Sequence, residues 1–96
     1  MLYCLLCTDK PNSVDLRLKV RPDHLAYLSS LGSKMKSAGP FLDDAGGPTG
    51  SLVIIEAADR SEAEKMAAAD PYALAGLFAS VEIKAWKWAL KNPEAA

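Results

Sequence analysis

The segments of this chain that have the composition of β-strands are apolar at nearly every position, rather than at every second one. Residues 2–8 (LYCLLCT) form an almost unbroken apolar run, and residues 51–57 (SLVIIEA) carry four consecutive apolar residues, three of them β-branched. Such runs predict strands that are covered on both faces. The set of possible folds is therefore narrow, because each face of the sheet has to pack against another layer.

The first helical region follows a turn at residues 9–13 and extends over about residues 14–37. Pro22 lies within it and either kinks one helix or begins a second. We predict a short helix or turn over residues 13–20 and the main helix over residues 22–36. Apolar residues at spacings of three, four and seven form one stripe along this region: Leu18, Leu25, Leu28, Gly32 and Met35.

The second helical region has two start signals. Ser61 and Glu64 form a capping box that opens a helix ending near Ala69. Asp70-Pro71 is the second signal, because aspartate is a good cap and proline is favoured at the first helical position. We predict a short helix or turn over residues 72–79.

The remaining strands complete a β-α-β-β-α-β order. Phe41 and Leu42 predict a short strand, residues 43–50 a hairpin loop, and residues 80–89 the last strand. This order predicts the α+β, ferredoxin-like arrangement, an antiparallel sheet with helices on one face. Because the other sheet face is also apolar, we predict a homodimer through it, with Trp86 and Trp88 among the interface residues.

Composition narrows the classes of function. The 96 residues suit a single domain, and the net charge of −1 provides no basic excess for nucleic-acid binding. No stretch approaches the length of a membrane span and no signal peptide is evident, so we expect a cytoplasmic protein. Cys4 and Cys7, with a single histidine, are too few for a zinc site or a disulfide framework, and we expect neither a metal nor a cofactor.

His24 is the only histidine, and on a helix it shares a face with Arg17 and Arg21, at spacings i, i+4 and i+7. One interpretation is a general acid–base residue flanked by arginines that hold an anion. The alternative is a half-exposed histidine on an amphipathic helix. Spacing alone favours the alternative.

Asp70 also has two interpretations. It can be a helix cap only, which Asp-Pro favours, or it can contact His24 and fix the tautomer of the ring. Tyr72 can line a pocket or belong to the core, and Gly39-Pro40 can bend the backbone around a ligand or simply form a turn.

Taken together, the motifs of the chain resemble those of the YCII-related (YciI-like) proteins over nearly its whole length. The motifs are Met-Leu-Tyr-Cys at 1–4, Arg-Pro-Asp-His-Leu at 21–25, Ala-Gly-Pro at 38–40, Thr-Gly-Ser at 49–51 and Asp-Pro-Tyr at 70–72. The resemblance implies a dimeric α/β barrel built on the ferredoxin-like fold, as in muconolactone isomerase. It also implies an active-site His–Asp pair at His24 and Asp70. For both residues, the functional interpretation is therefore favoured over the purely structural one.

The resemblance implies a class of reaction as well, since one characterised relative is a dehydrochlorinase that acts on a chlorinated hydroxyhydroquinone. Our leading hypothesis is a metal-free isomerase or lyase that acts on a small cyclic or aromatic, anionic substrate. In it, His24 and Asp70 are catalytic, and the substrate is bound by Arg17, Arg21, Tyr72, Gly39 and Pro40. The alternatives are a dimeric metabolite-binding or accessory module without catalysis, and a purely structural dimer.

Overall fold

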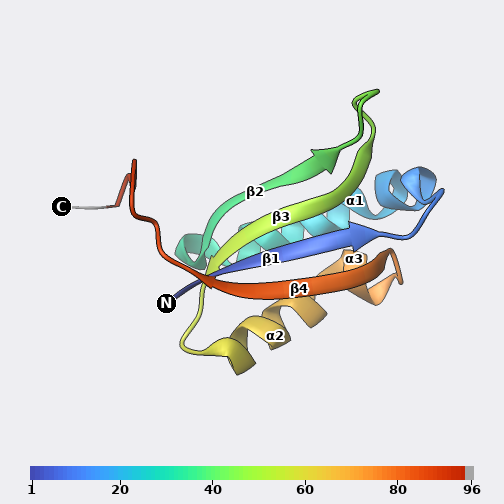
Figure 1. Ribbon diagram of the computed structural model, residues 1–96. Helices are drawn as coiled ribbons and strands as arrows, with labels where there is room; N and C mark the ends of the chain where they lie inside the picture. The colour runs from blue at the N-terminus through green and yellow to red at the C-terminus, as the bar shows by residue number, and fades with distance from the viewer. Residues whose placement is uncertain (95–96) are drawn as a thin grey trace.

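The computed structural model describes residues 1–94 and is organised around a four-stranded antiparallel sheet. The strand order is β2-β3-β1-β4, with β1 and β3 in the centre and β2 and β4 at the edges (Figure 1). The strands are β1 (Leu2–Asp9), β2 (Met35–Leu42), β3 (Pro48–Glu56) and β4 (Phe78–Trp86). The two predominantly apolar runs, residues 2–8 and 51–57, thus lie in the two central strands.

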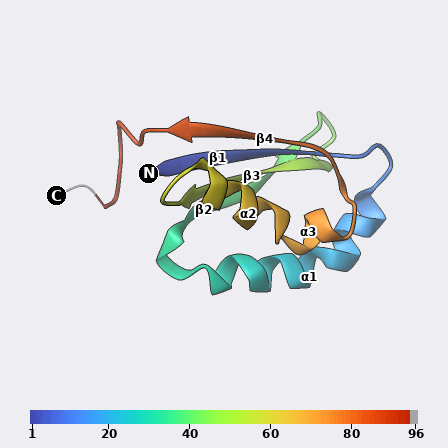
Figure 2. The ribbon, with the colours of Figure 1, turned by 90° about the horizontal axis from the view of Figure 1, so that it is seen from below.

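Three helices lie on one side of the sheet: α1 (Val14–Ser30), α2 (Arg60–Ala68) and α3 (Pro71–Leu74) (Figure 2). A short 3₁₀ turn, Gly32–Lys34, joins α1 to β2. The α+β, ferredoxin-like fold predicted from the order of the elements is confirmed. No helix among residues 1–94 is both long enough and apolar enough to cross a membrane.

The predicted break at Pro22 is wrong, because α1 continues through this residue. Arg17 before it and His24 and Leu28 after it are all buried, so one face of the helix is turned inward on both sides of Pro22. The helix ends earlier than predicted. Gly32 has a φ of +59°, a backbone conformation that stops an α-helix and suits glycine.

The strand and helix boundaries also shift. β2 covers residues 35–42 rather than two residues, and Met35 belongs to it rather than to the helical stripe. The last strand begins and ends earlier than predicted, so Trp88 lies beyond it. Helix α2 is capped by Asp59, which accepts from the Glu62 N–H, rather than by Ser61.

The core lies between the sheet and the helices. Tyr3, Leu5 and Cys7 alternate on the covered face of β1, beside Val53 and Ile55 of β3. Cys4 lies on the opposite face, so the two thiols point to different sides of the sheet. Leu28 and two alanines of α2 pack on this face and close the core.

Gly50 of β3 marks a close approach of backbone to backbone. A Cβ atom at this position would lie 2.2 Å from the carbonyl oxygen of Cys7, far closer than a non-bonded carbon and oxygen can approach. Only glycine therefore fits here, which accounts for the Thr-Gly-Ser sequence at the start of β3.

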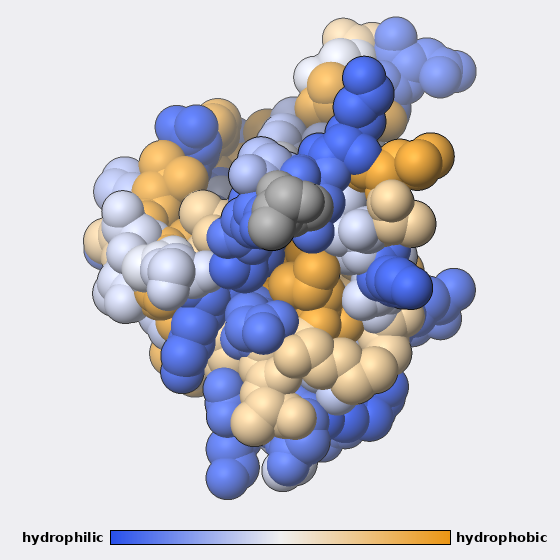
Figure 3. Space-filling view, turned by 90° about the vertical axis from the view of Figure 1, so that its left-hand side faces the viewer, coloured by the Kyte–Doolittle hydropathy of each residue, from blue (hydrophilic) through white to orange (hydrophobic). Residues whose placement is uncertain are grey.

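No element among residues 1–94 covers the other sheet face, which is turned toward the viewer in Figure 1. Apolar side chains lie on it from all four strands: Leu2, Cys4, Leu6, Phe41, Leu52, Ile54 and Trp86. Phe41 and Trp86 are 42% and 37% exposed. At the end of the sheet where β1 begins, hydrophobic residues alternate with hydrophilic ones over the surface (Figure 3).

Candidate active site

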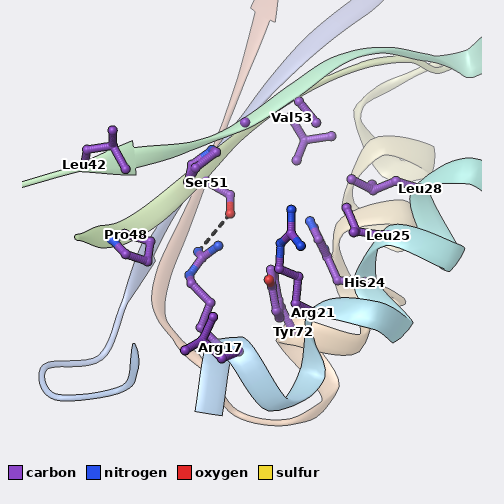
Figure 4. A pocket seen from close by; sticks show the side chains of 14 residues that line it. Arg17, Arg21, His24, Leu25, Leu28, Leu42, Pro48, Ser51, Val53 and Tyr72 are labelled. Atoms are coloured by element: carbon purple, nitrogen blue, oxygen red, sulfur yellow. Dashed lines mark hydrogen bonds between the residues drawn. The ribbon is translucent and has the colours of Figure 1, made fainter. Parts of the chain in front are cut away.

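A pocket of about 280 Å³ lies between α1 and the part of the sheet formed by the edge strand β2 and its neighbour β3 (Figure 4). Its walls are mostly apolar, and its polar groups come mainly from α1 and α3. The lining residues are Arg17, Leu18, Arg21, His24, Leu25, Leu28, Ala38, Gly39, Pro40, Leu42, Pro48, Ser51, Val53 and Tyr72. An apolar cavity with a few convergent polar groups is the usual form of a small-molecule site.

His24 and Asp70 are in contact. The Nδ1 atom of His24 lies 2.9 Å from both carboxylate oxygens of Asp70. Both side chains are 8% exposed. An aspartate at Nδ1 favours the tautomer that carries its proton there, so Nε2 is the nitrogen left for a ligand.

Asp70 is also a helix cap. Its Oδ1 accepts from the Tyr72 N–H at 2.9 Å, and Pro71 occupies the first turn of α3. The sequence presented the cap and the contact with His24 as alternatives, but the structure contains both. The cap fixes the carboxylate against the backbone, and the carboxylate in turn fixes the ring of His24.

Tyr72 stacks directly on His24. The ring centroids are 3.9 Å apart and the planes differ by 17°. Tyr72 is 1% exposed, yet it lines the pocket. Burial raises the pKa of its hydroxyl, while the charges of Arg17 and Arg21 act in the opposite direction. The hydroxyl therefore keeps its proton at neutral pH and can donate a hydrogen bond.

Arg17 is held by a residue that the sequence analysis did not single out. Its Nε and Nη2 donate to the two oxygens of Asp9, at 2.7 and 2.9 Å, and Nη2 also donates to Ser51 Oγ at 2.9 Å. Burial disfavours the charge on Arg17, but the hydrogen bond and the charge of Asp9 outweigh it and raise the pKa of Arg17. Hence Arg17 lines the pocket as part of an internal ion pair.

Arg21, Gly39 and Pro40, which the sequence leads us to expect as substrate-binding residues, also line the pocket. Arg21 is exposed on α1, between the buried Arg17 and His24. Gly39 and Pro40 lie within β2 rather than in a turn. Pro40 pairs with Ser51, so the two residues lie on the same wall of the pocket.

Cys7 lies in the core below the polar groups. Burial raises the pKa of its thiol to about 12, and the negative charges of Asp70 and Asp9 add to the rise. Near neutral pH the thiol is protonated and has little nucleophilic character. Within residues 1–94, no group of three or more His, Cys, Asp and Glu side chains is placed to hold a metal ion.

The fold and the site define a small α+β protein with an apolar pocket, lined by a histidine that a buried carboxylate contacts. The chain belongs to the YCII-related domain family, whose model matches residues 1–87. The resemblance noted from the sequence motifs is thereby confirmed.

Two relatives cover nearly the whole chain. Protein YciI of Escherichia coli O6:H1 is 41% identical over 95 residues, which is 91% of this chain and 97% of that protein. An uncharacterised protein of Haemophilus influenzae is 39% identical over 95 residues, with the same coverage. Neither name states an activity.

A similar solved structure does have an activity in its name. It is the 5-chloro-2-hydroxyhydroquinone dehydrochlorinase of Burkholderia phenoliruptrix in complex with 2,5-dihydroxybenzoquinone, at 36% identity and a TM-score of 0.83, covering 91% of this chain and 94% of that one. A NIPSNAP family protein from Agrobacterium tumefaciens, at 16% identity and a TM-score of 0.58, covers 98% of this chain and 97% of its own and shares the fold alone.

Proposed function

We propose that this protein is an enzyme that transfers a proton on a small cyclic or aromatic, anionic compound, as an isomerase or as a lyase of the dehydrochlorinase type. The contact between His24 Nδ1 and Asp70 carries the proposal. In this arrangement His24 Nε2 takes a proton from the substrate, and Asp70 holds the ring in place and stabilises the imidazolium that forms. Loss of a proton to His24 and of chloride from carbon would together eliminate HCl.

The pocket supports the proposed class of substrate. Its apolar walls suit a flat ring, and Arg21 and the Tyr72 hydroxyl suit ring oxygens that carry negative charge. The similar dehydrochlorinase was solved with a dihydroxybenzoquinone, a compound with these features.

We further propose that the protein acts as a homodimer joined through the uncovered sheet face. The apolar residues of this face include Leu52 and Trp86, which would remain in contact with water in a monomer. Burying them against a second copy removes that cost. The free thiols of Cys4 and Cys7 suit a reducing compartment such as the cytoplasm.

Chloride release from 5-chloro-2-hydroxyhydroquinone tests the activity. The rate is measured in the absence of air, and the rate without protein is subtracted. We expect turnover by the wild type and none by His24→Gln, which preserves the size of the side chain. Lys19→Gln is the matched control, because Lys19 is exposed on α1 and does not line the pocket. The control should retain full activity.

The other outcomes separate the alternatives. Binding of 2,5-dihydroxybenzoquinone without turnover of 5-chloro-2-hydroxyhydroquinone or related chlorinated hydroquinones would contradict the proposed enzymatic activity. It would favour a metabolite-binding module instead. Equal turnover by wild type and His24→Gln would remove His24 from the mechanism. If neither compound binds, the proposed class of substrate is wrong.

A further inference from the structure

Arg17, Tyr72 and His24 form a single stacked column. The Tyr72 ring lies 3.9 Å from the His24 ring, and the Cζ atom of Arg17 lies 4.6 Å from the Tyr72 centroid. Arg17 and His24 are seven residues apart on α1, about 10.5 Å along the helix axis. That separation leaves room for one aromatic ring, and the ring of Tyr72, from α3, fills it.

Carboxylates hold both ends of this column. Asp9 receives two hydrogen bonds from Arg17, and Asp70 receives one from the Tyr72 N–H while contacting His24 Nδ1. The two acidic side chains come from the end of β1 and the start of α3. Arg17 and His24 therefore cannot move far without breaking a contact with a buried carboxylate, and the backbone of Tyr72 is bound to the carboxylate that contacts His24.

Arg17 is consequently a poor receptor for a charged ligand. The Asp9 side chain is 5% exposed and compensates its charge at 2.7 Å. A second anion would have to compete with a buried, bidentate ion pair.

Arg21 differs from Arg17 in these respects. It lies one turn further along α1 and lines the same pocket, but its side chain is exposed. Among residues 1–94, no side-chain hydrogen bond or ion pair holds it. Its charge nevertheless reaches the pocket, since it acts on the Tyr72 hydroxyl.

We propose that the two arginines have different roles: Arg17 is a positioning residue that orients His24 through the ring of Tyr72, and Arg21 is the residue that selects a negatively charged substrate. The Arg21 half rests on the proposed function. The Arg17 half does not, because it concerns the column alone. A flat anion with charge on a ring oxygen would place that oxygen toward Arg21 and a proton within reach of His24.

Nuclear magnetic resonance tests the positioning role without a ligand. The chain has a single histidine, so its ring signals are unambiguous. We expect Arg17→Lys to retain the charge beside Asp9 but to lose the planar group of the column, which shifts the His24 ring proton signals and weakens their cross-peaks with Tyr72. Lys19→Gln should leave both unchanged.

A second variant guards against a folding failure. Arg17→Met with Asp9→Leu removes the ion pair without leaving a buried charge, and it should shift the His24 signals in the same way. Unchanged His24 signals in either variant, Arg17→Lys or Arg17→Met with Asp9→Leu, would overturn the positioning role if that variant is folded.

Binding of 2,5-dihydroxybenzoquinone, measured by calorimetry, tests the selecting role. We expect Arg21→Gln to weaken binding about tenfold or more and to reduce its dependence on salt, Arg21→Lys to recover part of the loss, and Arg17→Lys to weaken it less than about threefold. Equal losses from Arg17→Lys and Arg21→Gln would overturn the division. If the wild type does not bind the probe, the Arg21 role is overturned with the proposed function, while the His24 signals still decide the Arg17 role.

Discussion

The carboxylate of Asp70 contacts Nδ1 of His24 through both oxygens at 2.9 Å, and one of them also accepts from the backbone N–H of Tyr72. A side chain fixed in this way has little freedom to rotate. The helix cap thus preorganises the histidine, and a structural role and a role in the site coexist in one residue.

Asp70→Ala should destabilise the fold more than removal of an ordinary cap. Loss of a cap costs about 1 kcal/mol, and the variant also leaves the buried Nδ1–H of His24 without an acceptor, at about 1–3 kcal/mol. Urea unfolding measures the difference. Asp59→Ala is the matched control, because Asp59 caps α2 in the same way but is exposed. Similar losses in both variants would show that the His24 contact adds no stability.

The ion pair between Arg17 and Asp9 should behave as a buried pair. Either Asp9→Asn or Arg17→Gln should cost about 3–5 kcal/mol, because each leaves one partner buried and unpaired, and the double change should cost less than the sum. The exposed pair of Arg60 and Glu64 is the control, with a coupling of about 0–1 kcal/mol. Additive losses in a urea double-mutant cycle at Arg17 and Asp9 would contradict the coupling.

Much of the fold was predictable because the central strands carry local signals. The apolar runs at 2–8 and 51–57 predict buried strands wherever they occur in a chain. The errors arose where tertiary packing or one dihedral angle overrides local preference. Pro22 breaks isolated helices but is tolerated in α1, and Gly32 was counted in an apolar stripe although its positive φ ends the helix.

The site was predictable only in part, for a related reason. Helical spacing groups Arg17, Arg21 and His24 without any knowledge of the fold, and all three line the pocket. The contact between His24 and Asp70 spans 46 residues, and the motif resemblance rather than the spacing pointed to it. Asp9 and Ser51 were not among the predicted site residues. Asp9 lies at the end of β1, eight residues before Arg17 in the sequence.

Rising pH should destabilise the protein through Cys7. Burial raises the pKa of the thiol from its ordinary 9.0 to about 12 in the folded chain. Between these values the unfolded chain binds fewer protons than the folded one, so the free energy of unfolding falls as pH rises. This thiol lowers the free energy of unfolding by at most about 1.4 kcal/mol per pH unit. Below pH 9 the thiol is protonated in both states, and its contribution to stability is fully present.

Urea unfolding of wild type and Cys7→Ala from pH 8 to 11 measures this effect. The tyrosines titrate in both proteins, so their contribution cancels when the two stabilities are compared. The stability difference between them should shrink as pH rises. Cys4→Ala is the control, since Cys4 is only partly buried and should show a weaker trend. Parallel curves for wild type and Cys7→Ala would contradict the raised pKa.

Gly50→Ala should be strongly destabilising. The added methyl group would lie 2.2 Å from the Cys7 carbonyl oxygen, so β1 and β3 must separate. We expect a loss of at least about 2 kcal/mol by urea unfolding. Gly39→Ala is the control, because a Cβ there meets no atom within 4 Å. Equal stability of the two variants would show that the strands adjust without cost.

A charge on the uncovered sheet face should dissociate the proposed homodimer. Leu52 lies on this face opposite Leu6 in the central strand pair, and in a face-to-face dimer it would be removed from water. Leu52→Glu would bury an unpaired carboxylate at that interface, at a cost of several kcal/mol. Sedimentation equilibrium should give twice the chain mass of 10.3 kDa for the wild type and the chain mass for the variant. Leu74→Glu is the control, because Leu74 lies on α3, on the helical side of the sheet, and is 75% exposed. It should remain dimeric. A monomeric wild type, or dissociation by both changes alike, would rule out this face as the interface, and the burial of the apolar residues of β1 and β3 would then need another partner.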